Sequence, residues 1–297
     1  MGYLFISVAL ISGAVKGYCG KRTSGFVTQY KDAMFINMVR MLFCIVIGFL
    51  MLAAGGSITL LKIDWKTLGI TALSGVTTSV FVVCWLISVK RGAYMMLDVF
   101  LMLGVLVTLL CSYFAFGEPI RPNQWFGLAV LIAAVFIMCS YSNSIKGKMS
   151  VLSFVLLVIC GVSNGLTDFS QKLYIHTSEV QNAAVFNFYT YIFSALTLLV
   201  FYIFFKAKDS SGVGSVGILR SIFPYVLVMS VCLFLNSFFK TRAAHYLTSA
   251  QLYPLNQGCS LILSSIMSSV LFKEKLTPKC ITGLLLSFAA LLIINLL

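Results

Sequence analysis

The chain has 297 residues, of which 60% are hydrophobic and only 10% are charged, and its mean hydropathy is +1.01. Soluble domains carry about 25% charged residues, so this composition excludes an ordinary soluble domain and indicates a membrane protein. The formal net charge of +13 does not indicate nucleic-acid binding. The basic residues lie in short gaps between apolar runs, and no gap is long enough to fold a basic domain.

Ten segments are apolar enough to be read as membrane-spanning helices, each of which needs about 20 residues. In chain order, we expect helices at residues 3–20, 33–54, 67–89, 93–116, 123–141, 150–172, 183–205, 216–239, 248–272 and 278–297. The gaps between them hold turn-forming residues and leave no room for a soluble domain. Any function must therefore reside in the bundle or in its short loops.

The second half of the chain repeats the first. FGEPIRPNQWFGLAVLIAAVFIM at 116–138 matches FKEKLTPKCITGLLLSFAALLII at 272–294, and ISGAVKG at 11–17 matches ICGVSNG at 159–165. These matches divide the chain into two five-helix halves, 1–145 and 146–297. Because five is odd, equivalent helices cross the membrane in opposite directions. We therefore predict an all-α membrane protein with ten transmembrane helices in two inverted repeats, and a substrate site near the membrane midplane.

Two motifs suggest a family. Each half has a Gly-x-x-x-Gly in its first helix, at Gly13–Gly17 and at Gly161–Gly165, and a Gly/Lys-Glu-x-x-x-Pro turn before its fifth. With the ten helices and the repeat, these motifs resemble the EamA-type branch of the drug/metabolite transporter superfamily. The resemblance implies a multi-pass protein of the bacterial inner membrane that moves a small polar metabolite without a cofactor. It also implies peripheral fifth and tenth helices, which serve as dimer or support helices in that family and allow a homodimer here.

The chain departs from the family at Lys16, where members often carry an aromatic residue. The small cationic-drug exporters of the superfamily rely on a membrane glutamate in helix 1. The first predicted helix here has no carboxylate, which disfavours that activity. The resemblance leaves the substrate, the direction of transport and the coupling ion open.

The orientation in the membrane is also open. Thirteen of the 21 Lys and Arg residues fall in the loops after helices 1, 3, 5, 7 and 9, and six fall on the other side. The positive-inside rule therefore favours termini outside the cytoplasm. The resembled family usually has its termini inside, so the two expectations conflict.

Four ionisable residues fall inside the predicted spans: Lys16, Arg40, Asp98 and Asp168. Each costs about 2.5–3.5 kcal/mol at a helix centre, so we expect them to face partners or a polar cavity. Lys16, Arg40 and Asp98 lie at similar depth on the thirteen-charge side. Lys16 could instead extend its ammonium to the membrane surface along the lipid.

Asp168 lies towards the other side, near three basic residues, Lys172, Lys240 and Arg242. A simple ion pair between Asp168 and Lys172, four residues apart on one helix, is one alternative. The other is a second charged cluster at the opposite mouth of a central cavity. Buried ion pairs add little net stability and fit a switch. We therefore predict gating residues at Asp98, Asp168, Lys172, Lys240 and Arg242.

For the substrate we expect an anionic or zwitterionic group held by Lys16 and Arg40. Polar and aromatic residues on the same helix faces complete the predicted substrate-binding set: Trp85, Asp98, Asn164, Tyr253, Asn256 and Gln257. For any one aromatic residue, core packing or a place at the membrane interface is the alternative. We predict no metal site, because the two histidines stand apart.

These residues favour a secondary transporter that works by alternating access. One alternative is a helical scaffold or assembly subunit, although a scaffold needs no polar interior. A membrane-embedded transferase is the other, but the sequence shows no grouping of nucleophile, base and metal ligands, so we expect no catalytic residues and no enzyme activity. The expected partners are a small-molecule metabolite and the lipid bilayer.

Overall fold

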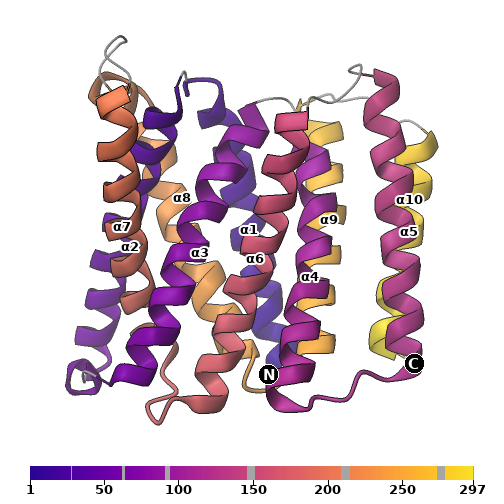
Figure 1. Ribbon diagram of the computed structural model, residues 1–297, viewed down its shortest axis with the longest axis horizontal. Coiled ribbons are helices and arrows are strands. Elements are labelled where there is room, and N and C mark those ends of the chain that lie inside the picture. The colour runs from indigo at the N-terminus through magenta and orange to yellow at the C-terminus, as the bar shows by residue number, and fades with distance from the viewer. Residues whose placement is uncertain are drawn as a thin grey trace.

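The computed structural model describes residues 1–27, 29–61, 64–90, 94–145, 151–208, 215–272 and 278–296. Over these residues the chain forms an upright bundle of α-helices, and both termini lie at the same end of it (Figure 1). The helices are α1 Gly2–Ser24, α2 Tyr30–Ala54, α3 Trp65–Lys90, α4 Tyr94–Phe116, α5 Pro122–Ile145, α6 Val151–Thr177, α7 Ala183–Lys208, α8 Ser215–Ala243, α9 Ser249–Phe272 and α10 Pro278–Leu296, with a short 3-10 turn, η1 Ile58–Leu60, after α2.

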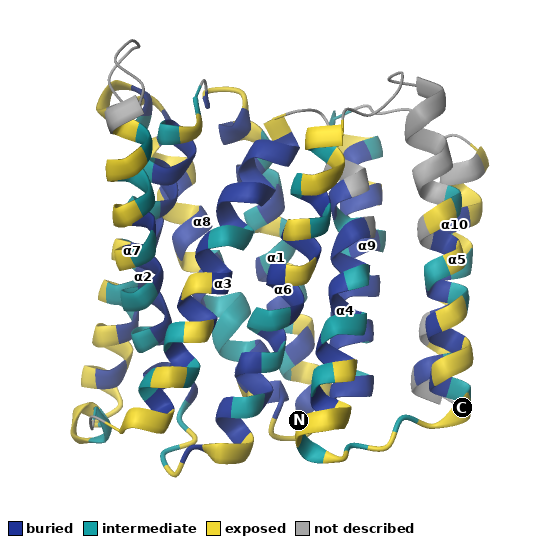
Figure 2. Cartoon of the chain, in the orientation of Figure 1, coloured by how far each residue is buried: buried dark blue, intermediate teal, exposed yellow. Residues whose placement is uncertain are grey.

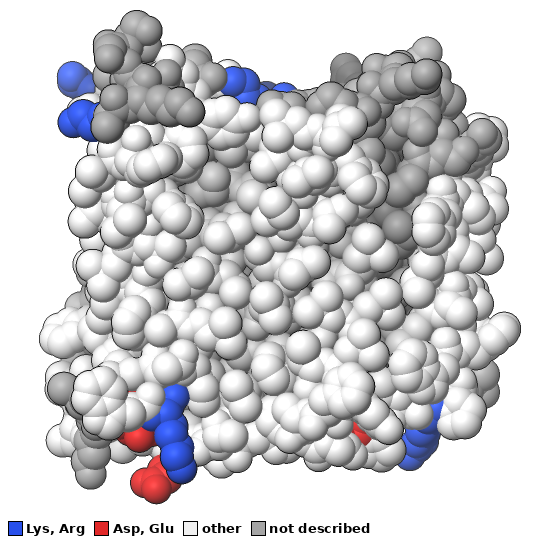
Figure 3. Space-filling model, viewed as in Figure 1, with Lys and Arg blue, Asp and Glu red and all other residues white. Residues whose placement is uncertain are grey.

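Within the described residues, seven helices, α1 to α3 and α6 to α9, are long and apolar enough to cross a membrane. Shorter apolar stretches lie in α4 at Phe100–Phe116 and in α10 at Ile281–Ile294. The chain is therefore a multi-pass membrane protein, and the prediction of membrane-spanning helices is confirmed for seven of the ten. The face shown in Figure 3 agrees, since its described charged residues lie near its two ends and its middle is uncharged.

Polar side chains set the starts of several helices, where the first backbone N–H groups have no helical partner. The Asp64 carboxylate accepts hydrogen bonds from the Thr67 backbone at 3.0 Å and from the Thr67 hydroxyl at 2.9 Å. Asn182 accepts from the Ala184 N–H at 2.8 Å before α7. Pro122 and Pro278 begin α5 and α10, a position where proline loses no hydrogen bond. These residues place the helix starts close to the predicted ones.

Some helices end later than predicted. α1 continues to Ser24, beyond residue 20, and α6 continues to Thr177, beyond residue 172. The extra turns contain Lys21 and Arg22 in α1 and His176 in α6. Basic residues suit the negative end of a helix, so a span can extend past its apolar run.

Equivalent helices of the two halves, which are five apart in chain order, have nearly equivalent packing partners. α1 packs on α8 as α6 packs on α3, while α2 packs on α7 and α5 on α10. The first helices of the two halves, α1 and α6, run in opposite directions (Figure 1). This is the pattern that two inverted repeats require.

One pair of contacts breaks this equivalence. Gly104 of α4 lies directly against Gly161 and Gly165 of α6, and a Cβ atom at any of the three would overlap backbone atoms of the facing helix. The Thr108 hydroxyl links the two helices by donating a hydrogen bond to the Gly165 carbonyl at 2.9 Å. Small residues allow this close approach of membrane helices. The corresponding pair, α1 and α9, packs more loosely, with a cavity between its helices.

α5 and α10 form a pair at one edge of the bundle and reach the other helices through α4 and α9 (Figure 1). Gly127 of α5 sits against Ile294 of α10, and Asn123 donates to the Ile293 carbonyl at 3.4 Å. Buried residues concentrate in the helices at the centre of the bundle (Figure 2). Any polar site there is thus shielded from the surrounding lipid.

Candidate functional site

A polar cavity of about 70 Å³ lies at the centre of the bundle, between α1, α3, α4, α6, α8 and α9. It has room for only a few water molecules. Six of the eight predicted substrate-binding residues line it: Lys16, Trp85, Asp98, Asn164, Asn256 and Gln257. Asn236, Ser260 and Ser264 also line it, although the predicted site omitted them.

Lys16 points into the protein. Its Nζ lies 5.9 Å from the centre of the Phe81 ring, and its side chain lines the cavity. The alternative of a lysine extended through the lipid is therefore wrong. Lys16 makes no ion pair with any residue that the structure describes. It faces the cavity as an uncompensated cation.

Arg40 lies behind Lys16 and is only 2% exposed. Its Nη1 donates to the Asn37 side-chain oxygen at 2.5 Å, but its Nε–H has no partner among the described residues. Asn37 is itself fixed, because its amide donates to the carbonyls of Ala33 and Val82 at 2.8 and 3.3 Å. Arg40 shares a smaller void with Lys16 and not the main cavity.

Asp98 reaches the cavity from the first turns of α4 and hydrogen bonds with Ser264 of α9. It forms no ion pair with Lys16 or Arg40 in the part of the chain that the structure describes. Lys16 acts on it only as a more distant charge. The expected pairing of Asp98 with one of these cations stays a prediction about another conformation.

Asp168 pairs with Lys240 of α8, with 2.5 Å between Oδ1 and Nζ, and both side chains are buried. Lys240 also lines the cavity that contains Lys16. Lys16 and Lys240, the partner of Asp168, therefore border the same central cavity, and their assignment to opposite mouths of it stays a prediction. Side chains on a helix point back towards its N-terminus. α1 and α8 run in opposite directions (Figure 1), so this geometry lets Lys16 and Lys240 reach the same central cavity.

The other two predicted gating cations lie elsewhere. Lys172 pairs with Glu118 at 3.3 Å and donates to the carbonyls of Ala244 and Leu247. Arg242 lies over the rings of Phe5 and Phe238, at 5.3 and 5.7 Å. Within the described residues neither pairs with Asp168. For Arg242 the reason is geometric, since residues two apart on a helix, such as 240 and 242, face different ways.

Tyr253 is the predicted substrate-binding residue that contacts neither cavity. It is fully buried, and its hydroxyl donates to the backbone carbonyl of Asp168 at 2.6 Å. This bond fixes the turn of α6 that carries the Asp168 carboxylate. The structure therefore gives Tyr253 a place beside the ion pair, in a supporting position.

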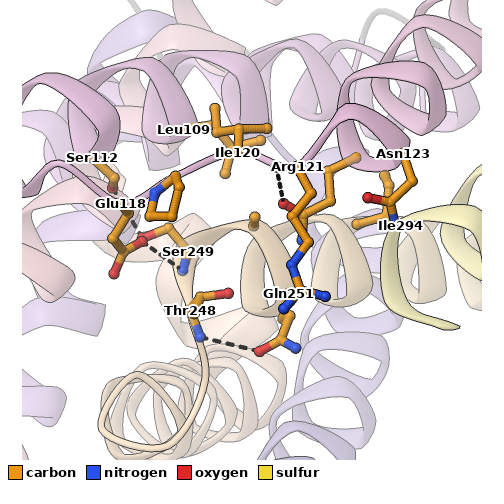
Figure 4. Close-up of a pocket in the computed structure, with 13 residues that line it drawn as sticks. Leu109, Ser112, Glu118, Ile120, Arg121, Asn123, Thr248, Ser249, Gln251 and Ile294 are labelled. Carbon is orange, nitrogen blue, oxygen red and sulfur yellow. Dashed lines mark hydrogen bonds between the residues drawn. The ribbon is translucent and has the colours of Figure 1, made fainter. Parts of the chain in front are cut away.

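A group of polar contacts joins three segments at the end of the bundle that holds the termini. Glu118, in the loop between α4 and α5, accepts from the Ser249 backbone N–H at 3.0 Å (Figure 4). It also pairs with Lys172 of α6. These three residues, which we call the Glu118 latch, join the α4–α5 loop to α6 and to the start of α9. Burial opposes the charge on Glu118, but Lys172 and Ser249 hold the pKa of this carboxyl below its ordinary value. Glu118 belongs to the repeated turn motif, which by itself gives no sign of these contacts.

A separate cavity of about 230 Å³ lies beside the latch, between the start of α9, the α4–α5 loop and α10 (Figure 4). Thr248 donates from its backbone to Gln251 at 3.4 Å on the wall of this cavity. None of the predicted substrate-binding residues lines it. This cavity lies near the end of the bundle that holds the termini and is distinct from the central site.

Two amides in the central cavity lack partners. Asn164 Nδ2 and Asn256 Oδ1 are buried and have no hydrogen bond to any described residue. Leaving such atoms unpaired costs about 1–3 kcal/mol each, so the cavity suits a polar ligand. At the offset that places Gly13 on Gly161, Lys16 falls on Asn164. Equivalent positions of the two halves thus line the same cavity, one with an ammonium group and the other with an amide. The described residues contain no group of three His, Cys, Asp or Glu side chains that could hold a metal ion.

Comparisons with known proteins agree with this architecture. The model of the EamA-like transporter family matches residues 1–140 and again 151–296. A solved structure described as "Crystal structure of protein" is similar over 99% of this chain and 96% of its own, with a TM-score of 0.67 and 14% sequence identity. At that identity the similarity shows the fold alone. A comparison with curated proteins found no match.

Proposed function

We propose, since this chain belongs to the EamA-like transporter family, that it is a secondary transporter that moves a small anionic or zwitterionic metabolite by alternating access. The observation that carries the proposal is the charge around the central cavity. Lys16, Lys240 and Asp98 line the cavity, Asp168 pairs with Lys240, and Arg40 shares a smaller void with Lys16, so these five groups carry one positive charge in surplus. A carboxylate, phosphate or sulfonate would neutralise that surplus through charge-assisted hydrogen bonds.

The contacts of the bundle support a particular access route. The Glu118 latch joins segments at the terminal end and the glycine contact holds α4 against α6 in the middle of the bundle, whereas the cavity separates α1 from α9. A cavity of about 70 Å³ is too small for a metabolite. Substrate therefore enters when α1 and α9 move apart, and leaves on the other side when α4 separates from α6.

The family and the packing favour ten spans in two inverted repeats, 1–145 and 146–297, in the bacterial inner membrane. α5 and α10 are the surface for a homodimer. For orientation, the charge count places the thirteen-charge side in the cytoplasm. Labelling of a single cysteine in the loop between α7 and α8 checks this, because reaction from outside intact cells would reverse the assignment.

The unpartnered amides in the cavity favour a carrier over a scaffold, because a purely structural bundle gains nothing from unpaired buried polar atoms. A carrier also needs no nucleophile or base. Uptake of a labelled metabolite into proteoliposomes separates a transporter from both alternatives.

Ligand charge is the direct test. We would screen carboxylates, phosphates and sulfonates against size-matched neutral and amine analogues by thermal shift, and then titrate the best binder. Lys16→Gln and Arg40→Gln should each weaken binding by about 10- to 150-fold, the value of about 1.5–3 kcal/mol for a lost charged contact. Arg242→Gln is the matched control, since Arg242 is outside the central cavity. Preference for neutral or cationic ligands, with both variants binding like wild type, would contradict the proposal.

A further inference from the structure

A second void lies beside the central cavity, between Lys16 and Arg40, neither of which forms an ion pair with a described residue. Its volume is about 10 Å³, and it is lined by Lys16, Arg40, Phe81, Val82, Trp85 and Leu233. Four of these six residues are apolar. The wall of the void therefore carries positive charge at Lys16 and Arg40 and is apolar elsewhere.

Arg40 is the unusual member of this wall. A guanidinium has five N–H donors, yet among the described residues Arg40 donates only to Asn37, and its Nε–H is buried without a partner. Lys16 is a second positive charge close enough to repel Arg40. A buried charge without a counter-ion is costly, and two like charges raise that cost. The void is thus where a negative charge would stabilise the protein most.

The size of the void limits what that charge can be. A volume of about 10 Å³ is at the lower limit for one water-sized group. Phosphate, sulfate and a whole carboxylate are larger and extend beyond it. Chloride, a single atom slightly larger than a water molecule, needs the Lys16 side chain to move outward to make room for it.

We propose that this void is a halide site, which holds chloride between the Arg40 guanidinium and the Lys16 ammonium. Water fits the same space but leaves both charges uncompensated. Chloride is less strongly hydrated than a phosphate or a carboxylate, and the two cations offset its loss of water in a wall that also contains Phe81, Val82 and Leu233. Asn37, fixed by its bonds to two carbonyls, holds the guanidinium in place for it. The proposal stands on these contacts and holds whether or not an organic anion is transported, although an organic anion held by Lys16 and Arg40 would compete with chloride for the same two charges.

Trp85 provides a built-in reporter, because it lines the void and heavier halides quench tryptophan fluorescence on contact. The chain has only three tryptophans. The others, Trp65 and Trp125, are 83% and 48% exposed, so Trp65→Phe/Trp125→Phe leaves a protein that reports from Trp85 alone. In that background, bromide and iodide should quench saturably, chloride should compete with them, and gluconate should not.

Arg40→Gln in the same background should weaken the apparent halide affinity by about ten-fold or more. Arg40→Lys keeps the charge and should weaken it less, and Arg242→Gln should leave it unchanged. Quenching that rises linearly with halide in every variant would show collision only and would overturn the site. Should Arg40→Gln fail to fold, thermal stability in chloride and gluconate at equal ionic strength decides on the Trp85-only protein. Chloride should raise the melting temperature, and equal melting temperatures would overturn the site.

Discussion

Asp168→Asn removes the carboxylate that neutralises Lys240 and changes the side-chain size very little. The pair is buried, with side-chain exposures of 1% for Asp168 and 8% for Lys240. Removing one partner leaves the other charge buried and unpaired, which costs about 3–5 kcal/mol. Given about 2.1 cal/mol/K of unfolding entropy per residue and 297 residues, that loss lowers the melting temperature by about 5–8 °C. The hydrogen bond from Tyr253 uses the Asp168 backbone, so it survives the substitution.

The assay is a double-mutant cycle on purified protein in detergent, measured by denaturant unfolding. Lys240→Met alone should cost as much as Asp168→Asn, for the same reason. The double variant should recover most of the loss, because a neutral pair of similar volume replaces a buried ion pair at little cost. Arg242→Gln serves as the control, since this cation lies over aromatic rings and its loss costs about 0.5–1 kcal/mol. Losses that simply add in the double variant would refute the reasoning, as would a single-variant cost below about 1 kcal/mol.

Three further predictions use other contacts. Gly104→Ala should destabilise the protein by about 1–3 kcal/mol, because the added Cβ overlaps the α6 backbone. Gly69→Ala is the control, since Gly69 has open space around it and the substitution should cost nothing comparable. Equal melting temperatures for the two variants would argue against a tight α4–α6 contact. Asp98→Asn should lower the initial transport rate per folded molecule more than it lowers expression, and unchanged kinetics would count against a gating role. Glu118 has a pKa held below its ordinary value of 4.5, so its stabilisation is present above that pH and is lost as pH falls through the lowered pKa. The gap in melting temperature between wild type and Glu118→Gln should therefore shrink below about pH 4.5, and a constant gap would contradict the latch.

The helix positions could be predicted because a membrane span depends on the length of an apolar run, which is local. The inverted repeat could be predicted for a similar reason, since Gly13 and Gly17 recur as Gly161 and Gly165 in matching sequence. Most of the predicted substrate-binding residues reached one cavity because polar stripes on membrane helices turn inward, away from lipid.

Partner choice could not be predicted in the same way. Lys172 is one turn from Asp168, yet it bonds to Glu118 and to two carbonyls of the α8–α9 turn. Those acceptors come from distant parts of the chain, and only the packing of α6 against that turn brings them within reach. The inward direction of Lys16 likewise depends on the rotation of α1 against α8, which tertiary contacts decide.

The unlike residues at equivalent positions of the two halves have an energetic consequence. Two identical inverted repeats would give the inward- and outward-facing states the same free energy, apart from the difference between the two sides of the membrane. Lys16 is equivalent in the repeat to Asn164, and Gly20 is equivalent to Asp168. When the two halves exchange conformations during transport, the charged residues that are buried therefore change. Under the proposed mechanism, a difference of only 1.4 kcal/mol sets a tenfold preference for one resting state. The duplicated backbone supplies two states, and these few unmatched side chains decide which one the empty protein occupies.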